Sequence, residues 1–249
     1  MSDYKSISKR RSETDYIMPL WLPFLPIIVS FIGGIVAALL LIFFAFSPSP
    51  ASTVLNGSSV SIPTATQTVV PNYLGLLLAP FMIIIYVIGA VSAALMGYVI
   101  YRLIKRFNDH ASRMKALFGS VNQDGRENQV ISEIDSLPRR DPAEWAILIA
   151  VFTIIPFLSI VAAVLIFYIF HSLNKDFVKI ERAENNGFMQ IGWKGDRYFK
   201  MVDRSTVLYI VLTIITGGIF MLYWLYTVAK DPNEHFREDW RIEDSITPS

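Results

Sequence analysis

The chain has 249 residues and a formal net charge of +1, and 53% of its residues are hydrophobic while only 17% are charged. Soluble domains carry about 25% charged residues, so this composition excludes an ordinary soluble domain, and the balanced charge gives no reason to expect nucleic acid as a partner. The chain contains no cysteine, which excludes disulfides, thiolate metal sites and cysteine nucleophiles.

Three long segments contain no Asp, Glu, Lys or Arg: residues 16–101, 145–174 and 205–229. About 20 apolar residues cross the hydrocarbon core of a bilayer, so the first segment holds two spans and each of the others holds one. We therefore predict an all-α, polytopic integral membrane protein with four hydrophobic helical segments and amphipathic helix extensions on the cytoplasmic side. The predicted divisions are a basic N-terminal tail (1–16), a first helical pair (17–101), an amphipathic basic segment (102–144), a third membrane segment with a polar extension (145–204) and a fourth with an acidic tail (205–249).

The N-terminal tail, residues 1–16, carries four basic residues before the first apolar run. The bias of Lys and Arg toward the inner face of membranes predicts a cytoplasmic N-terminus in the cell membrane. The run at 17–46 is longer than the apolar core of about 7–15 residues in a signal peptide, so we expect it to be retained as a span. The Ser/Thr/Pro-rich loop at 47–71 has no charge and is predicted to be external, and Asn56 opens an Asn-Gly-Ser glycosylation pattern.

Small residues recur four apart in both predicted spans of the first pair, which lets two helix backbones approach closely in lipid. This spacing indicates helix packing rather than a pore lining. The residues concerned are Gly34 and Ala38 in the first span and Gly89, Ala93 and Gly97 in the second.

The helix is expected to continue beyond the second span as an amphipathic stretch. Leu103, Phe107, Met114 and Phe118 fall on one helical face and basic residues fall on the other. Such a stretch could lie on an anionic lipid surface or pack against a partner helix. The acidic residues 234–244 are expected to form a solvated face.

Three segments can be aligned on a lysine, which predicts an internal repeat of one membrane unit. A tyrosine stands seven residues before each lysine, a pair of small residues stands further upstream, and two of the segments carry a histidine five residues after the lysine. The two histidines could meet and bind a metal or titrate near neutral pH, but interfacial histidines without such a role are commoner, so no metal, cofactor or catalytic residue is assigned. The repeat residues are Tyr98, Lys105 and His110; Tyr168 and Lys175; and Gly217, Gly218, Tyr223, Lys230 and His235.

A simple crossing by the third segment conflicts with the charges of the residues that follow it. Four simple crossings would place residues 175–204, which hold seven Lys and Arg, outside the cell. In the alternative, the third and fourth segments are re-entrant hairpins that bend at Pro156 and at Gly217-Gly218. Bends exposed to lipid leave backbone groups unpaired, so four plain spans are favoured and the hairpins stay open as the second reading.

The stretch Thr216-Gly217-Gly218-Ile219-Phe220, with Tyr223-Trp224 after it, resembles a prokaryotic multi-pass membrane-domain family of unknown function. Members of that family carry Thr-x-Gly-Ile-aromatic followed by Tyr-Trp and a basic helix end. The resemblance covers residues 204–240, and Phe220 stands where the family usually has tyrosine. It implies the class of protein and no mechanism.

No charged residue lies inside the predicted spans, which argues against a proton-coupled pathway, and no catalytic motif stands in a suitable context. We therefore expect a non-catalytic scaffold or accessory subunit of a membrane complex rather than an enzyme. Its expected partners are the lipid bilayer and a protein partner or a second copy of the chain. The alternative is an oligomeric channel or transporter for ions or small solutes.

Overall fold

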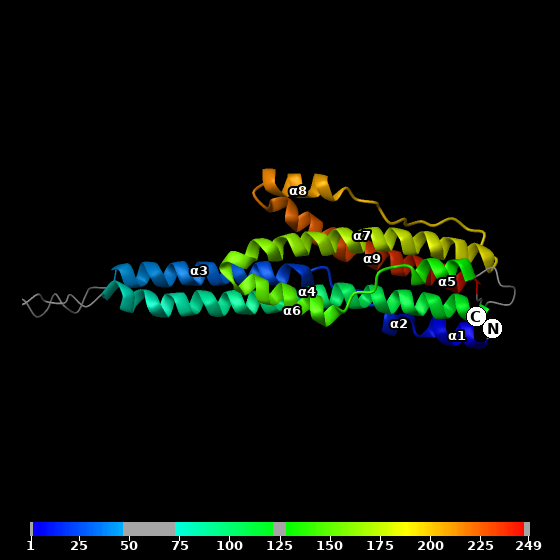
Figure 1. Cartoon of the computed structure of the whole chain (residues 1–249), viewed down its shortest axis with the longest axis horizontal. Coiled ribbons are helices and arrows are strands. Elements are labelled where there is room, and N and C mark those ends of the chain that lie inside the picture. The colour runs from blue at the N-terminus through cyan, green and yellow to red at the C-terminus, as the bar shows by residue number, and fades with distance from the viewer. Residues whose placement is uncertain (1, 47–72, 122–127, 247–249) are drawn as a thin grey trace, which may run out of the picture. The chain divides into compact units, whose positions relative to one another are not determined.

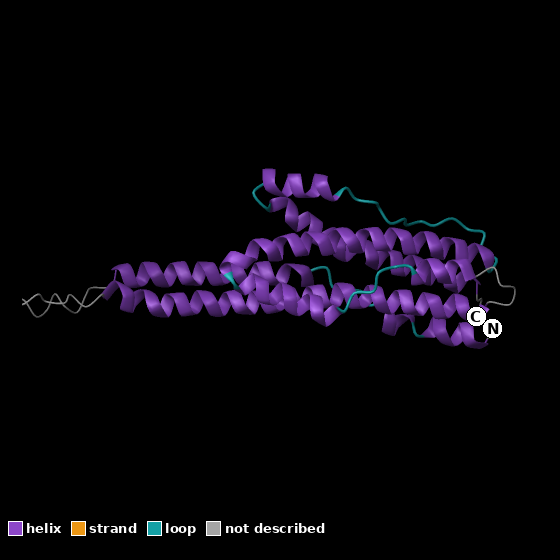
Figure 2. Cartoon of the chain, viewed as in Figure 1, coloured by secondary structure: helices purple, strands orange, loops and turns teal. Residues whose placement is uncertain are grey.

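A computed structural model describes residues 2–46, 73–121 and 128–246, and these residues form helices without any strand (Figures 1 and 2). The predicted external loop at 47–71, and with it Asn56, lies outside the described residues. The helices are α1 (Ser2–Lys9), α2 (Arg11–Thr14), η1 (Leu22–Phe24), α3 (Leu25–Phe46), α4 (Tyr73–Val121), α5 (Asn128–Asp135), α6 (Pro142–Ile154), η3 (Pro156–Leu158), α7 (Ser159–Gln190), α8 (Thr206–Ile215) and α9 (Ile219–Ile246).

The chain divides into two compact units, one formed by residues 26–92 and the other by residues 1–25 and 93–249. In the smaller unit, the Ser30 hydroxyl donates to the Ser92 hydroxyl over 2.8 Å, and Ser92 donates to the carbonyl of Pro26 over 3.1 Å. A Cβ added to Gly33 would come within 2.4 Å of the Ile88 side chain, so α3 and α4 are in close contact there.

The small-residue face predicted for this unit is displaced by one position. Gly34 and Gly89 have open space where a Cβ would be, and Ala38 is exposed, whereas Gly33 and Ala37 are buried. Two adjacent glycines satisfy the spacing of four equally well, so spacing alone could not select the register. In the larger unit, Ala93 is fully buried, and Gly97 lies against the backbone of α6 at Ala146.

The third apolar segment is two helices rather than one. The Asp141 side chain caps α6 by accepting from the backbone N–H of Ala143 and Glu144, and Pro142 occupies the first turn, where a missing donor costs least. Pro156 disfavours helical backbone in the residue before it, and Ile155 is extended, with φ −85° and ψ 112°. Helix α6 therefore ends, and α7 folds back along it (Figure 1).

The fourth apolar segment is also broken, at Gly217-Gly218. Both glycines have positive φ, 59° and 95°, which side chains rarely adopt. The Gly218 N–H donates to the carbonyl of Thr213 over 2.7 Å and the Gly217 N–H to that of Ile214 over 3.1 Å, the paired bonds of a Schellman helix stop. Helix α8 thus ends at Ile215, and α9 packs back against it.

Among the described residues, three helical stretches are long and apolar enough to cross a membrane: Leu22–Phe43, Ala79–Val121 and Pro156–Gln190. Helices α6 and α8 are shorter, so the predicted count of four spans is not confirmed. These three stretches indicate a membrane-embedded protein.

The polar halves of the long helices pack together in the larger unit. The predicted apolar face of α4 is buried, with Leu103, Phe107, Met114 and Phe118 at most 1% exposed. The opposite, basic face is buried too at Arg106 and Arg113. Helix α4 is therefore surrounded by partners on both faces and is not an amphipathic surface helix over this length.

The N-terminal residues are part of this packing rather than a free tail. Helices α1 and α2 lie beside the end of α9 (Figure 1). Tyr4, Asp15 and Met18 are buried. The Asn233 side chain holds this segment through both of its amide atoms, accepting from the Met18 N–H over 2.9 Å and donating to the Met18 carbonyl over 2.8 Å.

Candidate functional site: a buried histidine–carboxylate cluster

Four titratable side chains from three helices converge in the larger unit. They are His110 on α4, Glu184 on α7, and His235 and Asp239 on α9, and all four are fully buried. One ligand atom from each lies within 4.8 Å of the others. We call this group the histidine–carboxylate cluster.

The short distances in the cluster involve one nitrogen of each imidazole. His110 Nε2 is 2.8 Å from Glu184 Oε1 and 3.5 Å from Asp239 Oδ2. His235 Nε2 is 3.2 Å from Glu184 Oε2 and 3.3 Å from Asp239 Oδ2. Both Nε2 atoms therefore face the same two carboxylates.

The opposite edge of the His110 ring is held by Asp15 from the N-terminal segment. His110 Nδ1 is 3.0 Å from Asp15 Oδ1, and Arg113 forms a two-pronged pair with the same carboxylate, with Nη2 at 2.6 Å from Oδ2. The Trp240 indole N–H also donates to Asp15 over 2.8 Å. Burial alone would raise the pKa of Asp15, but His110 and Arg113 outweigh it and lower that pKa to about 2.

The opposite edge of the His235 ring faces a further carboxylate. His235 Nδ1 is 3.5 Å from Glu181 Oε2, which itself accepts from the backbone N–H of Met201 over 2.7 Å. Arg197 reaches the cluster from outside, with Nη2 at 2.8 Å from Asp239 Oδ1 and 3.7 Å from Glu184 Oε2.

The charges of the cluster act strongly on one another because all four side chains are fully buried, away from bulk solvent. Burial lowers the pKa of His235, but the facing Asp239 and Glu184 raise it to about 10. Burial and the negative charge of Glu184 raise the pKa of Asp239. The site therefore favours a positive charge between these carboxylates.

Several atoms of the cluster lie close together without hydrogen-bond geometry. Neither ring nitrogen of His235 has an aligned acceptor, and Glu184 Oε2 and both oxygens of Asp239 have no aligned donor. Buried polar groups in proteins are nearly always hydrogen-bonded, so an arrangement of this kind calls for an explanation.

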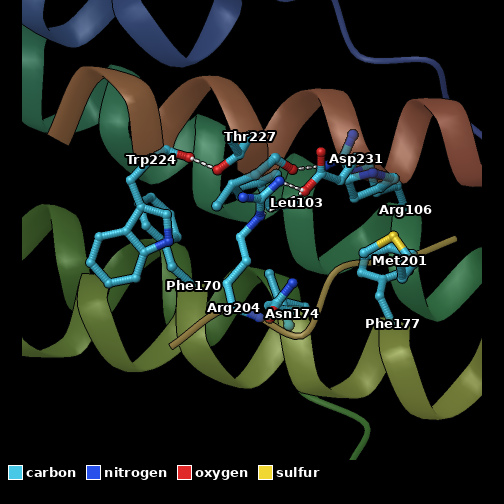
Figure 3. Close-up of a pocket in the computed structure, with 13 residues that line it drawn as sticks. Leu103, Arg106, Phe170, Asn174, Phe177, Met201, Arg204, Trp224, Thr227 and Asp231 are labelled. Carbon is cyan, nitrogen blue, oxygen red and sulfur yellow. Dashed lines mark hydrogen bonds and ion pairs between the residues drawn. The ribbon is translucent and has the colours of Figure 1, made fainter. Parts of the chain in front are cut away.

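A second polar region lies where the apolar segments meet the polar halves, around a small pocket between α4, α7 and α9 (Figure 3). Arg204, just before α8, points across this pocket to Asp231 on α9, with Nη2 at 2.6 Å from Oδ2. Asn174 on α7 accepts from the Arg204 N–H over 3.0 Å. Arg140, just before α6, pairs with Asp176 on α7 over 2.8 Å.

Arg106 lines the same pocket and compensates for a proline in α9. Pro232 has no N–H to donate to the carbonyl of Val228, four residues earlier. The Arg106 guanidinium supplies donors instead, at 2.5 Å to the Val228 carbonyl and 3.4 Å to that of Ala229. It also donates to Asn233 Oδ1 over 3.2 Å.

Of the residues singled out from sequence, the structure brings His110 and His235 together, with ring centroids 5.3 Å apart. The repeat tyrosines, at positions 98, 168 and 223, are each about half exposed, and the repeat lysines lie outside the cluster. The repeat itself stays a prediction.

The expectation of a solvated acidic face after α9's apolar half is wrong for three of its five acidic residues, whereas Asp244 is exposed. Glu238, Asp239 and Glu243 are buried because α9 is enclosed by α4, α7 and the N-terminal helices. Sequence reasoning also missed Asp15 and Glu184. The spacing of His235 and Asp239, four residues apart and thus on one helical face, was the available signal.

Together, the fold and the cluster define an all-helical, membrane-embedded protein with a buried ionic core in its polar half. A family described as "Domain of unknown function (DUF4234)" matches residues 204–246, which include α8, α9 and two members of the cluster. This match agrees with the resemblance to an uncharacterised family and tests neither its sequence motif nor a prokaryotic origin. No curated protein and no solved structure matches the chain.

Proposed function

We propose that the chain is a non-catalytic membrane scaffold or accessory subunit, in which two apolar hairpins enter the bilayer from the face where the N-terminal segment lies. One hairpin is formed by α6 and α7, and the other by α8 and α9. Its direct partner is the lipid of that leaflet, and the polar bundle beyond the hairpins is available to a protein partner or a second copy.

The observation that carries this proposal is that ion pairs join the two ends of each apolar segment. Arg140 precedes the third segment and Asp176 follows it, and they are 2.8 Å apart. Arg204 precedes the fourth and Asp231 follows it, and they are 2.6 Å apart. A helix that crosses a bilayer has its ends about 30 Å apart, so each joined segment enters and leaves on the same side.

The lengths of the arms support the same reading. Helix α6 has 13 residues and α8 has 10, or about 20 Å and 15 Å at 1.5 Å per residue. Both are short of the hydrocarbon core of about 30 Å. The bends carry exposed apolar side chains, with Phe157 at 78% and Ile215 at 74% exposure. Both bends lie at the same end of the larger unit (Figure 1).

A bend exposed to lipid is unfavourable when it leaves backbone groups unpaired. In the fourth segment the helix stop pairs these groups. The N–H groups of Gly217 and Gly218 donate within the turn, and the Thr216 hydroxyl accepts from the N–H of Phe220 over 3.0 Å. Few backbone groups are then left to lipid. The hairpin topology also returns the basic residues 175–204 to the inner face, where such residues are enriched.

The position of the ionic groups favours a scaffold over a channel. They lie in the polar halves, beyond the apolar segments, and they tie α4, α7, α9 and the N-terminal segment together. Channels commonly place charged or carbonyl groups along the membrane path.

The test is topology, measured by single cysteines in this thiol-free chain. Cysteines at Ser58, Asn186 and Ser245 are treated in intact cells with a membrane-impermeant maleimide. We expect labelling at Ser58 alone, and labelling at all three positions after permeabilisation, with the unaltered chain as the blank. Equal labelling of Asn186 and Ser58 in intact cells would refute the hairpins.

The scaffold role is tested separately by reconstituting the purified chain into liposomes loaded with a small ion indicator. We expect leakage no faster than that of protein-free liposomes. A protein-dependent, saturable flux would replace the scaffold by the channel.

A further inference from the structure

We propose that His110, Glu184, His235 and Asp239 bind a divalent first-row transition-metal ion, for which zinc is the probe. This inference is independent of the proposed function, because it rests on the cluster and not on the topology of the hairpins.

The spacing of the ligand atoms is close to that of a tetrahedral site. Zinc bonds to imidazole nitrogen and carboxylate oxygen are about 2.0–2.2 Å long, so ligand atoms around a tetrahedral ion lie about 3.4 Å apart. The nitrogen-to-oxygen distances in the cluster are 2.8 Å to Glu184 Oε1, 3.2 Å to Glu184 Oε2, and 3.3 and 3.5 Å to Asp239 Oδ2. With one atom taken from each residue, the four ligand atoms lie within 4.8 Å of one another. An ion can enter this group with small movements of side chains.

The unaligned atoms point to a ligand independently of the spacing. His235 is fully buried, yet neither of its ring nitrogens has an acceptor in hydrogen-bond geometry. Both oxygens of Asp239 and Oε2 of Glu184 likewise have no aligned donor. A cation between His235 Nε2, Glu184 Oε2 and Asp239 Oδ2, which face one another, would satisfy these three atoms without requiring N–H directions.

Both histidines have the outer carboxylate that is usual for metal-bound imidazoles. In such sites the second ring nitrogen donates to a carboxylate, which fixes the tautomer and the ring orientation. Asp15 occupies this place for His110 Nδ1 at 3.0 Å, and Glu181 lies on the corresponding side of His235 at 3.5 Å. With Nδ1 protonated, the Nε2 lone pair of each ring is free to bind metal.

The net charge of the buried groups is compatible with a bound divalent ion, and equally with two added protons. Five buried carboxylates and two guanidinium groups surround the two imidazoles, which leaves a net charge of −3 while both rings are neutral. One divalent ion brings this to −1, and so do two added protons, one on each ring. The groups counted are Asp15, Glu181, Glu184, Asp239, Glu243, Arg113 and Arg197.

The ligand set selects the class of metal and its role. Two imidazoles with two carboxylates and no thiolate suit zinc and its divalent neighbours rather than copper(I) or calcium. The site is closed, with four protein ligands and no exposed face, which is the pattern of structural rather than catalytic zinc sites. The ion would fasten α4, α7 and α9, segments that lie far apart in the sequence.

The first experiment uses the intact, detergent-purified chain, stripped with a chelator and then titrated with zinc. We expect one zinc per chain, with X-ray absorption showing four nitrogen and oxygen ligands at about 2.0–2.1 Å, two of them imidazoles. Nitrogen-15 NMR of the zinc-loaded protein is expected to show two neutral imidazoles. Less than a tenth of a zinc per correctly folded chain, or two imidazolium rings at saturating zinc, would overturn the proposal.

Variants locate the ion. His235→Gln is expected to abolish stoichiometric binding, and Asp15→Asn, which removes no metal ligand but changes the outer partner of His110, is expected to weaken it about 10–100-fold. Glu238→Gln is the matched control, since Glu238 is a buried carboxylate next to Asp239 that accepts from the Tyr198 N–H instead, over 2.8 Å.

Zinc affinity that is unchanged in Asp15→Asn and in His235→Gln would place the ion elsewhere and contradict the proposal. If His235→Gln fails to fold, the absorption and NMR measurements on the unaltered chain still decide between the ion and the two protons.

Discussion

Arg106 shows how one side chain makes a proline acceptable inside a buried helix. A proline in a helix interior costs about 3 kcal/mol or more, partly because the carbonyl four residues earlier loses its donor. Here that carbonyl belongs to Val228, and the Arg106 guanidinium donates to it over 2.5 Å. The basic residue and the proline lie on different helices and act as one pair.

Removing Arg106 is therefore expected to destabilise the fold through the carbonyls it leaves behind. Arg106→Met keeps much of the apolar stem and strands buried acceptors, each costing about 1–3 kcal/mol. We expect a loss of about 2–4 kcal/mol in the free energy of unfolding, measured by denaturant titration in detergent. The double variant Arg106→Met, Pro232→Ala should recover about 1 kcal/mol, because the alanine introduced in place of the proline has a backbone N–H that can donate to the Val228 carbonyl within the helix.

Lys105→Met is the control for that experiment. Lys105 pairs with Asp109 at the surface, and exposed pairs contribute about 0–1 kcal/mol. An equal loss in both single variants, with no recovery in the double variant, would contradict the role assigned to Arg106.

At the residue scale, the sequence predicts the burial of some side chains and not of others. The buried apolar face of α4 follows from spacing alone, and the shared repeat position suggested that His110 and His235 could meet. Arg106 and Arg113 fall on the basic face opposite, and charged residues are rarely buried without partners. Their burial depends on carboxylates and carbonyls from distant segments, which local periodicity does not report.

At the scale of elements, Gly217 and Gly218 decide whether the fourth segment is a span or a hairpin. Their positive φ values, 59° and 95°, belong to a helix stop, and a Cβ at either position would meet only open space. Any effect of a substitution there is consequently a backbone effect.

The sign of that effect distinguishes the two arrangements. In the bent structure, Gly218→Ala forces a side chain into left-handed backbone, and we expect a loss of about 1–2 kcal/mol. In a straight helix the same change would add about 0.5–1 kcal/mol, because alanine favours helix over glycine. Thermal unfolding in detergent measures the difference.

Gly34→Ala is the internal reference, because Gly34 lies within α3 and also has open space around its Cβ position. We expect this substitution to stabilise. A stabilising Gly218→Ala of similar size would show that the fourth segment is continuous.

The bends themselves were visible in the sequence, at Pro156 and Gly217-Gly218, but the choice between kinked spans and hairpins was not. That choice depends on what joins the ends of each segment. The partners are Arg140 with Asp176 and Arg204 with Asp231. Each pair is separated by a long and largely uncharged stretch of chain, and no helical spacing rule connects its members.

At the scale of the whole molecule, the N-terminal segment closes the larger unit. Arg113 joins this segment to α9, because it pairs with Asp15 over 2.6 Å and with Glu243 over 2.6 Å. Its side chain is 2% exposed. Breaking a buried pair by removing one partner costs about 3–5 kcal/mol, since the remaining charges stay buried.

Arg113→Met should therefore lower the free energy of unfolding by about 3–5 kcal/mol and expose the N-terminal segment. We expect trypsin to cleave at Lys5, Lys9 or Arg10 in this variant much faster than in the unaltered chain. Lys115→Met, which removes a half-exposed pair with Asp135, should change neither measurement appreciably. Slow cleavage of the Arg113 variant would show that other contacts are sufficient to hold the segment.

The class of the protein, its helical content and the basic tail could all be predicted from composition and charge. The burial of that tail could not. Its partners on α9 lie more than 200 positions away, and their charges look like those of any solvated helix.

That separation has a consequence for biosynthesis. Ser8 donates to Glu243, and Trp240 donates to Asp15, across 235 and 225 residues of sequence. During translation α1 and α2 emerge before Trp240 and Glu243 have been made, so these helices complete their contacts only after α9 is present. Until α9 has been made, its contacts with α1 and with Asp15 are missing, and the nascent chain offers chaperones and proteases a segment that the folded protein encloses.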